Sequence, residues 1–132
     1  MDIPVPDTGA IETDLRALAC SLVQAFTSST GQAILATMFT GAAHLPEIAT
    51  ARRHMFDDRL ARAEPVVLRA IERGELPADT DPAELFKTLA ARIYLRLPIA
   101  ADLVDETTAD QAARVTLAAA RAGALRPARY GQ

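Results

Sequence analysis

Apolar residues recur every three or four positions through most of this 132-residue chain, and prolines and glycines interrupt the pattern at a few points. In an α-helix this spacing puts the apolar side chains on one face. Alternating apolar and polar runs rich in β-branched residues, which would indicate strands, are missing, while alanine is abundant. The pattern therefore predicts an all-α fold, and the length suits one domain with its own core.

Proline, glycine and capping residues divide the chain into five predicted helices. We expect a proline-rich lead-in over residues 1–8, a helical domain over 9–125 and a loose tail over 126–132. The helices are predicted to cover roughly positions 9–27, 30–43, 46–73, 82–97 and 107–122.

The boundaries follow from specific residues. Ser29 is a candidate N-cap for the second helix, and Asp81 followed by a proline is a strong start for the fourth. Gly74 and Gly123 are typical of the position just after a helix end. Pro65 falls inside the third predicted helix, where it cannot donate a backbone hydrogen bond, so we expect a kink there.

The fourth predicted helix is apolar on two sides. Leu85, Phe86, Leu89 and Ile93 form one stripe, whereas three apolar residues, Ala91, Tyr94 and Leu95, fall outside it. The fifth predicted helix carries alanine almost all round. Either both helices are well buried within one chain, or they pair with a second copy in a twofold four-helix interface. We favour the second interpretation, with dimer contacts at Ala91, Leu95, Ala112, Val115 and Ala119.

Two arginines lie on the apolar side of the third predicted helix. Arg52 and Arg59 point in nearly the same direction as its core stripe, which is costly unless the guanidinium is paired or reaches water. They could extend their heads to the surface, or form a salt bridge to Asp14 or Glu12. They could also line a small-molecule cavity. The ligand-lining residues on that hypothesis are Met38, Phe39, Met55, Phe56, Arg59, Leu89 and Ile93, although each Met or Phe alone also suits an ordinary core.

The sequence offers little for catalysis or for metal and nucleic-acid binding. His44 and His54 are the only histidines, without metal-ligand spacing, and Cys20 has no neighbouring base in the sequence. The formal net charge is −3, and no basic cluster is present. We therefore expect no catalytic residues, no metal and no cofactor. No signal peptide or membrane-spanning run is evident, which with a single cysteine favours the cytoplasm.

Residues 69–97, "RAIERGELPADTDPAELFKTLAARIYLRL", resemble the C-terminal domain of the tetracycline-repressor (TetR) family of bacterial transcription regulators. The shared features are an Arg-Gly-Glu-Leu turn after a long helix, an Asp-Pro-Glu helix start and a Tyr-containing segment. Two positions depart from the family pattern. Leu95 replaces a common second aromatic residue, and Ala91 with Arg92 replaces a frequent Gly-Pro.

The resemblance implies a five-helix bundle that binds a small, apolar effector in its helical core. It also implies a homodimer in which the last two helices form a four-helix interface. In this family a helix-turn-helix domain precedes the regulatory domain, and it is absent from these residues. Either the sequence is part of a longer protein, or the natural protein has lost its DNA-binding domain. DNA contact is therefore expected only through such a missing domain. The alternative is a helical protein-interaction module with no ligand cavity.

Overall fold

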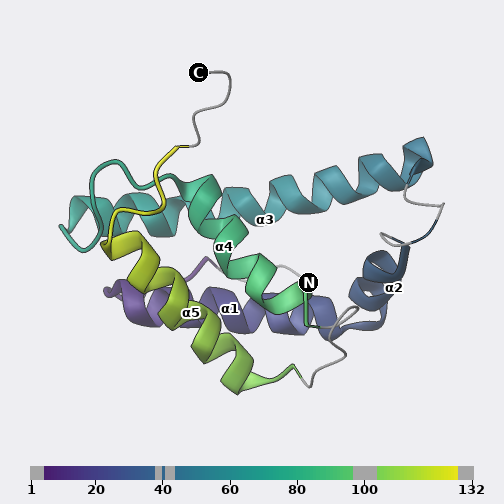
Figure 1. The fold of residues 1–132 in the computed structure, drawn as a ribbon, viewed down its shortest axis with the longest axis horizontal. Coiled ribbons are helices and arrows are strands. Elements are labelled where there is room, and N and C mark those ends of the chain that lie inside the picture. The colour runs from purple at the N-terminus through teal and green to yellow at the C-terminus, as the bar shows by residue number, and fades with distance from the viewer. Residues whose placement is uncertain (1–4, 38–39, 41–43, 97–103, 128–132) are drawn as a thin grey trace.

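The structure, a computed structural model, describes residues 5–37, 40, 44–96 and 104–127. All regular secondary structure in these residues is helical, which confirms the predicted fold class. The helices are α1 (Ile11–Thr27), α2 (Ser29–Thr37), α3 (Pro46–Glu72), α4 (Pro82–Tyr94) and α5 (Glu106–Arg121), shown in Figure 1. The predicted boundaries agree within about three residues except for α2, whose predicted C-terminal part falls partly outside the described residues.

Side-chain caps explain two helix starts, and one of them was predicted. Asp81 accepts a hydrogen bond from the Ala83 amide at 3.1 Å, with Pro82 in the first turn. Asp105 forms a capping box with Thr108 at the start of α5. The prediction for α2 was wrong by one residue. The N-cap is Ser28 and not Ser29. Ser28 has extended backbone geometry, and its hydroxyl accepts a hydrogen bond from the Gly31 amide.

Helix α1 lies at the centre of the bundle and packs against each of the other four helices. Its core stripe is fully buried at Ile11 and Leu15 and meets Leu89 and Ile93 of α4. Helix α5 contributes small residues to the same core, among them Ala112, which is 0% exposed. Small side chains let α5 approach α1 closely, so burial within one chain accounts for much of the alanine content of α5.

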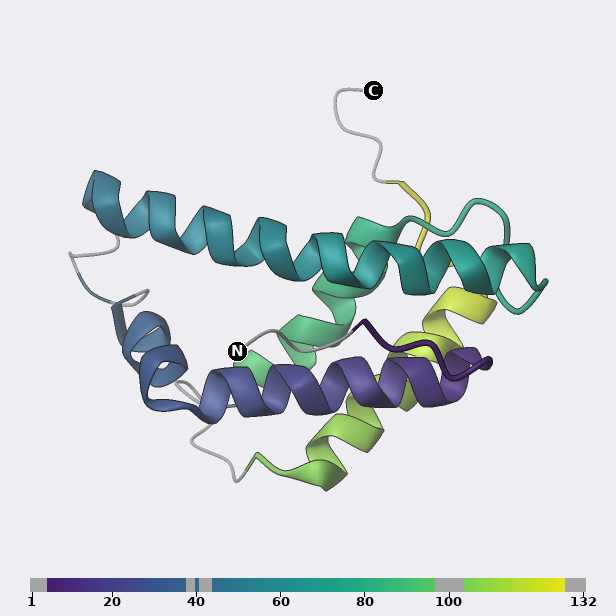
Figure 2. The same ribbon diagram turned by 180° about the vertical axis from the view of Figure 1, so that it is seen from behind.

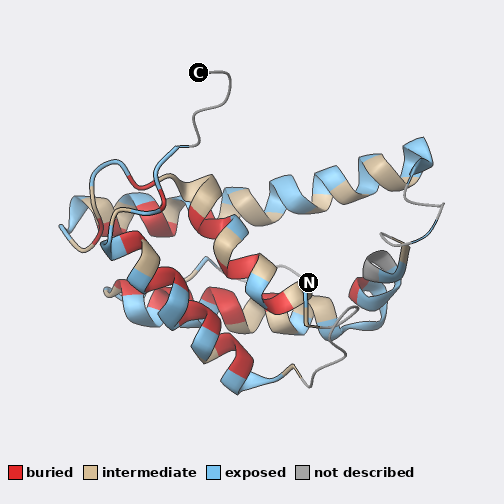
Figure 3. Cartoon of the chain, viewed as in Figure 1, coloured by how far each residue is buried: buried red, intermediate tan, exposed pale blue. Residues whose placement is uncertain are grey.

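Helix α3 is half inside the bundle and half outside it. Its C-terminal half buries Ala63, Val66, Val67 and Ala70, whereas its N-terminal half is largely exposed or half-buried (Figure 3). It remains one continuous α-helix through Pro65. Figure 2 shows the N-terminal half diverging from the C-terminal end of α1. This overhang brings one face of α3 opposite the side of α4 that carries Phe86.

The segments that follow α3 and α5, and the segment before α1, are held in place by backbone geometry and hydrogen bonds. Gly74 and Gly123 take positive φ values of 76° and 77° just after α3 and α5, as predicted for helix ends. The Asp81 amide donates to the Leu125 carbonyl at 2.8 Å, which fixes the chain after α5 against the start of α4. Near the N-terminus, Arg69 of α3 donates to the Pro6 carbonyl and lies 3.4 Å from a carboxylate oxygen of Asp7.

Candidate functional site

A cleft of about 740 Å³ lies between the C-terminal part of α1, the N-terminal half of α3 and the side of α4 that faces α3. Its volume is within the range of small-molecule sites. Phe26 of α1 contributes to one wall, Met55 and Phe56 of α3 to another, and Phe86 and Tyr94 of α4 to a third. The overhang of α3 creates this space, because among the described helices none packs directly beneath the part of α3 beyond the bundle.

Two aromatic pairs shape the cleft. The rings of Phe56 and Phe86 meet edge to face, with centroids 5.3 Å apart and planes at 69°. The rings of Phe26 and Tyr94 meet similarly, at 6.2 Å and 74°. Phe56 is 37% exposed, so part of its ring is available to a bound molecule. Edge-to-face pairs fix ring orientation, and together these rings give the cleft a largely apolar wall.

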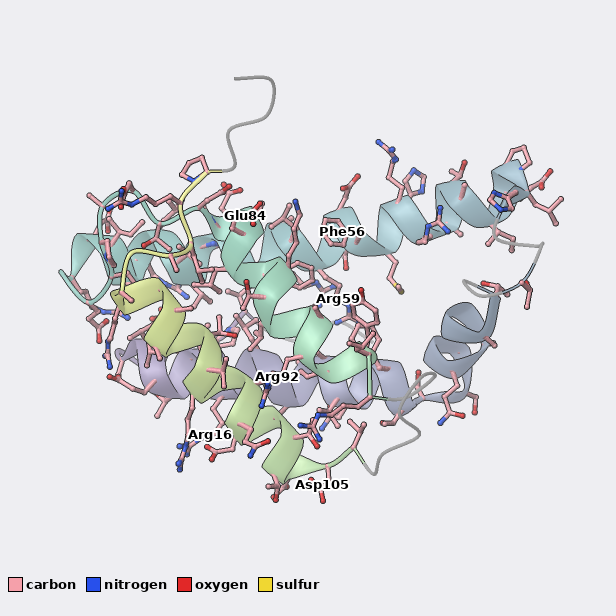
Figure 4. All side chains as sticks on the ribbon, viewed as in Figure 1. Arg16, Phe56, Arg59, Glu84, Arg92 and Asp105 are labelled. Carbon is pink, nitrogen blue, oxygen red and sulfur yellow. The ribbon has the colours of Figure 1, made fainter. Side chains whose placement is uncertain are left out.

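The α3 wall also carries charge. Arg52, Met55, Phe56 and Arg59 stand at positions i, i+3, i+4 and i+7 and so share one face of the helix. Figure 4 shows Arg59 in the space between α3 and α4. Both Arg52 and Arg59 are half-buried. Among the described residues, neither has a carboxylate within salt-bridge distance.

The structure does not support a salt bridge from these arginines to Asp14 or Glu12. Asp14 is fully buried, with Oδ2 3.7 Å from Nη2 of Arg73. Glu12 pairs with Arg121 of α5 instead. Both carboxylates lie near the start of α1, whereas the cleft lies at its other end. Two of the three interpretations of Arg52 and Arg59 therefore remain: the guanidinium group reaches water, or it lines a cavity.

The predicted ligand-lining residues are placed in three different ways. Met55, Phe56 and Arg59 border the cleft. Leu89 and Ile93 are 0% exposed in the core and do not border the cleft. Met38 and Phe39 lie outside the described residues.

Several residues on the cleft wall were missed from the sequence. Four of them, Lys87, Ala90, Ala91 and Tyr94, follow an i, i+3, i+4, i+7 pattern that defines the second side of α4. The spacing was visible in the sequence, but of these four residues only Ala91 was given a role, as a dimer contact. Ala91 and Tyr94 therefore border a cleft of their own chain, so part of the second apolar side of α4 lines this space.

The predicted dimer contacts are also divided. Leu95 and Val115 are 50% and 42% exposed, so both are accessible to another chain. Ala119 is partly buried against the core, and Ala112 is completely covered within this chain. Ala91 borders the cleft.

The described residues contain no group of three or more His, Cys, Asp or Glu side chains that could hold a metal ion. Burial and the nearby Glu106 carboxylate raise the pKa of the Cys20 thiol, which makes it a poor nucleophile at neutral pH. In the part of the chain that the structure covers, no helix is both long and apolar enough to cross a membrane.

Comparison with known proteins places this helical arrangement in a family. The sequence profile described as "Tetracyclin repressor-like, C-terminal domain" matches residues 5–127, nearly the whole chain. The chain belongs to this family. It is a tetracyclin repressor-like C-terminal domain.

One curated relative of this TetR-like domain is the "HTH-type transcriptional regulator AqdR" of Rhodococcus erythropolis. The two sequences are 30% identical over 94 residues, which is 71% of this chain and 45% of the relative. The match thus spans less than half of the relative's length.

Proposed function

We propose that this TetR-like domain binds a small, largely apolar effector in the cleft between α1, α3 and α4, and thereby controls a transcriptional repressor. The observation that carries the proposal is the cleft itself, with its edge-to-face aromatic pairs and an open volume suited to a small molecule. A helical module that served only to bind other proteins would not need such a space inside its own bundle.

The effector signal has a physical route toward the start of the chain. Residues Val5 and Pro6 lie in a small second hollow bordered by Leu22, Arg59 and Phe86, which also border the cleft. A ligand that moved these three side chains would change the surface against which Val5 and Pro6, in the segment before α1, are packed. The size of any such shift is set by the difference in the ligand's affinity for the two arrangements.

The proposed regulator acts as a cytoplasmic homodimer whose α4 and α5 helices pair with those of a second copy. Leu95 at the C-cap of α4 and Val115 of α5 are large, exposed apolar side chains that could take part. DNA contact would come from a helix-turn-helix domain outside these 132 residues. In the dimer, effector binding would change the relative placement of two such domains and so weaken operator binding.

Titration with Nile red, a neutral apolar fluorophore, tests the effector site. We expect saturable binding that Ala91→Trp weakens severalfold, because the larger side chain occupies part of the cleft. Ala61→Trp is the matched control, since Ala61 is exposed on α3 and does not border the cleft. Binding that does not saturate, or that Ala91→Trp leaves unchanged, would favour the interaction module without a ligand cavity.

A further inference from the structure

The cleft has the opposite charge to the chain as a whole. The sequence carries a formal net charge of −3. The cleft wall, in contrast, is bordered by the cations Arg52, Arg53, Arg59 and Lys87 and by a single carboxylate, Asp57. Lys87 is paired with Glu84 at 3.5 Å, but no carboxylate in the described part of the chain pairs with the three arginines. The cleft therefore has a local excess of positive charge.

Arg52 and Arg59 are the two arginines that bear on the cleft most directly. They are half-buried, whereas Arg53 and Asp57 are exposed. They are seven positions apart in the helix, so they stand about 10 Å apart along the axis with Met55 and Phe56 between them. A guanidinium beside an apolar wall loses part of its hydration, and an anionic group is the partner that best replaces the lost water.

We infer that the effector is an amphipathic organic anion, with its acidic group held by Arg52 or Arg59 and its apolar body against the aromatic rings. This inference rests on the proposed function and narrows the chemical class of its ligand. Phe26, Phe86 and Tyr94 provide the apolar surface, and the α3 arginines fix which end of the molecule points toward α3. A cationic amphiphile of the same size meets like charge on that wall and is disfavoured.

A ligand series with one tail and three head groups tests the inference. Decanoate, decanol and decyltrimethylammonium are each used to displace Nile red from the purified chain at neutral pH. We expect decanoate to bind at least about tenfold more tightly than decanol. A difference in affinity of this size is what a hydrogen bond to a charged group usually contributes. The trimethylammonium compound should bind most weakly.

Variants identify the residues responsible. Arg59→Met and Arg52→Met keep a long apolar stem but remove the charge, and one or both should reduce the preference of decanoate over decanol severalfold. Arg59→Lys should retain a clear preference. The matched control is Arg92→Met, which removes one exposed arginine from α4 outside the cleft (Figure 4) and should leave the preference unchanged. Urea unfolding of each variant establishes that the fold is intact.

Two contrary results have different meanings. If Nile red binds saturably but decanol competes as well as decanoate, or if neither Arg52→Met nor Arg59→Met alters the preference, the anionic effector class is wrong while the effector site stands. If neither Nile red nor any member of the series binds saturably, the proposed function fails and this inference fails with it.

Discussion

Phe56 of α3 and Phe86 of α4 meet edge to face at 5.3 Å, although one ring is 37% exposed and the other 5%. The pair thus joins the buried core to the open cleft. Phe86 is anchored among core residues, and Phe56 extends over the cleft from the overhanging half of α3. Removal of the Phe86 ring should therefore mainly affect stability, whereas removal of the Phe56 ring should mainly affect ligand binding.

Phe86→Ala should lower the free energy of unfolding by about 3–5 kcal/mol, because it leaves a cavity in the core. Phe56→Ala should cost only about 1 kcal/mol, since its ring is partly in solvent, but it should weaken Nile red binding severalfold. Urea unfolding followed by circular dichroism gives both stabilities. Equal losses of stability for the two variants would contradict the assigned burial.

Asp14 joins the segment before α1 to the C-terminal end of α3. One carboxylate oxygen accepts hydrogen bonds from the Thr8 amide at 2.8 Å and the Thr8 hydroxyl at 2.7 Å, and the other faces Arg73. Asp14→Ala should lower the free energy of unfolding by about 2 kcal/mol, because it leaves these donors without their buried acceptor. Asp79→Ala is the control, since its ion pair with Arg126 is solvent-exposed and should be worth less than about 1 kcal/mol. Similar losses in urea unfolding would refute the role of Asp14.

The pairing of Glu12 with Arg121 predicts a pH dependence. A hydrogen bond from the Arg121 side chain lowers the pKa of Glu12 from its ordinary value. The stabilisation from a lowered carboxyl pKa is present above the unfolded-state pKa and is lost as the pH falls through the folded-state value. The urea midpoint of Glu12→Gln should thus lie slightly below that of the parent chain at pH 7, and the two should converge at about pH 3. The difference should be small, because the pair is exposed, and should also shrink in high salt.

The proposed dimer can be tested through its exposed apolar residues. Leu95→Glu and Val115→Glu should each shift the chain from twice its mass toward 14.1 kDa in light scattering at tens of micromolar, because a charge would be desolvated in the interface. Leu68→Glu makes the same change at an exposed position on α3 and should leave the mass unchanged. A parent chain that is already monomeric at this concentration would rule out the α4–α5 dimer.

The sequence alone determined where most helices begin and end, because the signals are local. Asp81 caps α4 through an amide two residues away, and Gly74 and Gly123 adopt positive φ values that other residues rarely tolerate. The spacing of Ile11 and Leu15 likewise fixed the buried side of α1. These signals involve neighbours within one or two helical turns, so they can be read without knowledge of the fold.

Only the tertiary structure decided which apolar side of a helix meets which neighbour. Leu89 and Tyr94 lie on two sides of α4 that are similar in sequence, yet one side enters the core and the other borders the cleft. The small residues of α5 were equally consistent with contacts inside the chain and with contacts to a second chain, and Ala112 proved to be inside. Hydrophobic burial is non-directional, so periodicity shows that a face must be covered but not by what. Which side of α4 borders the cleft depends on the overhang of α3, and that overhang follows from the packing of the C-terminal half of α3 in the core.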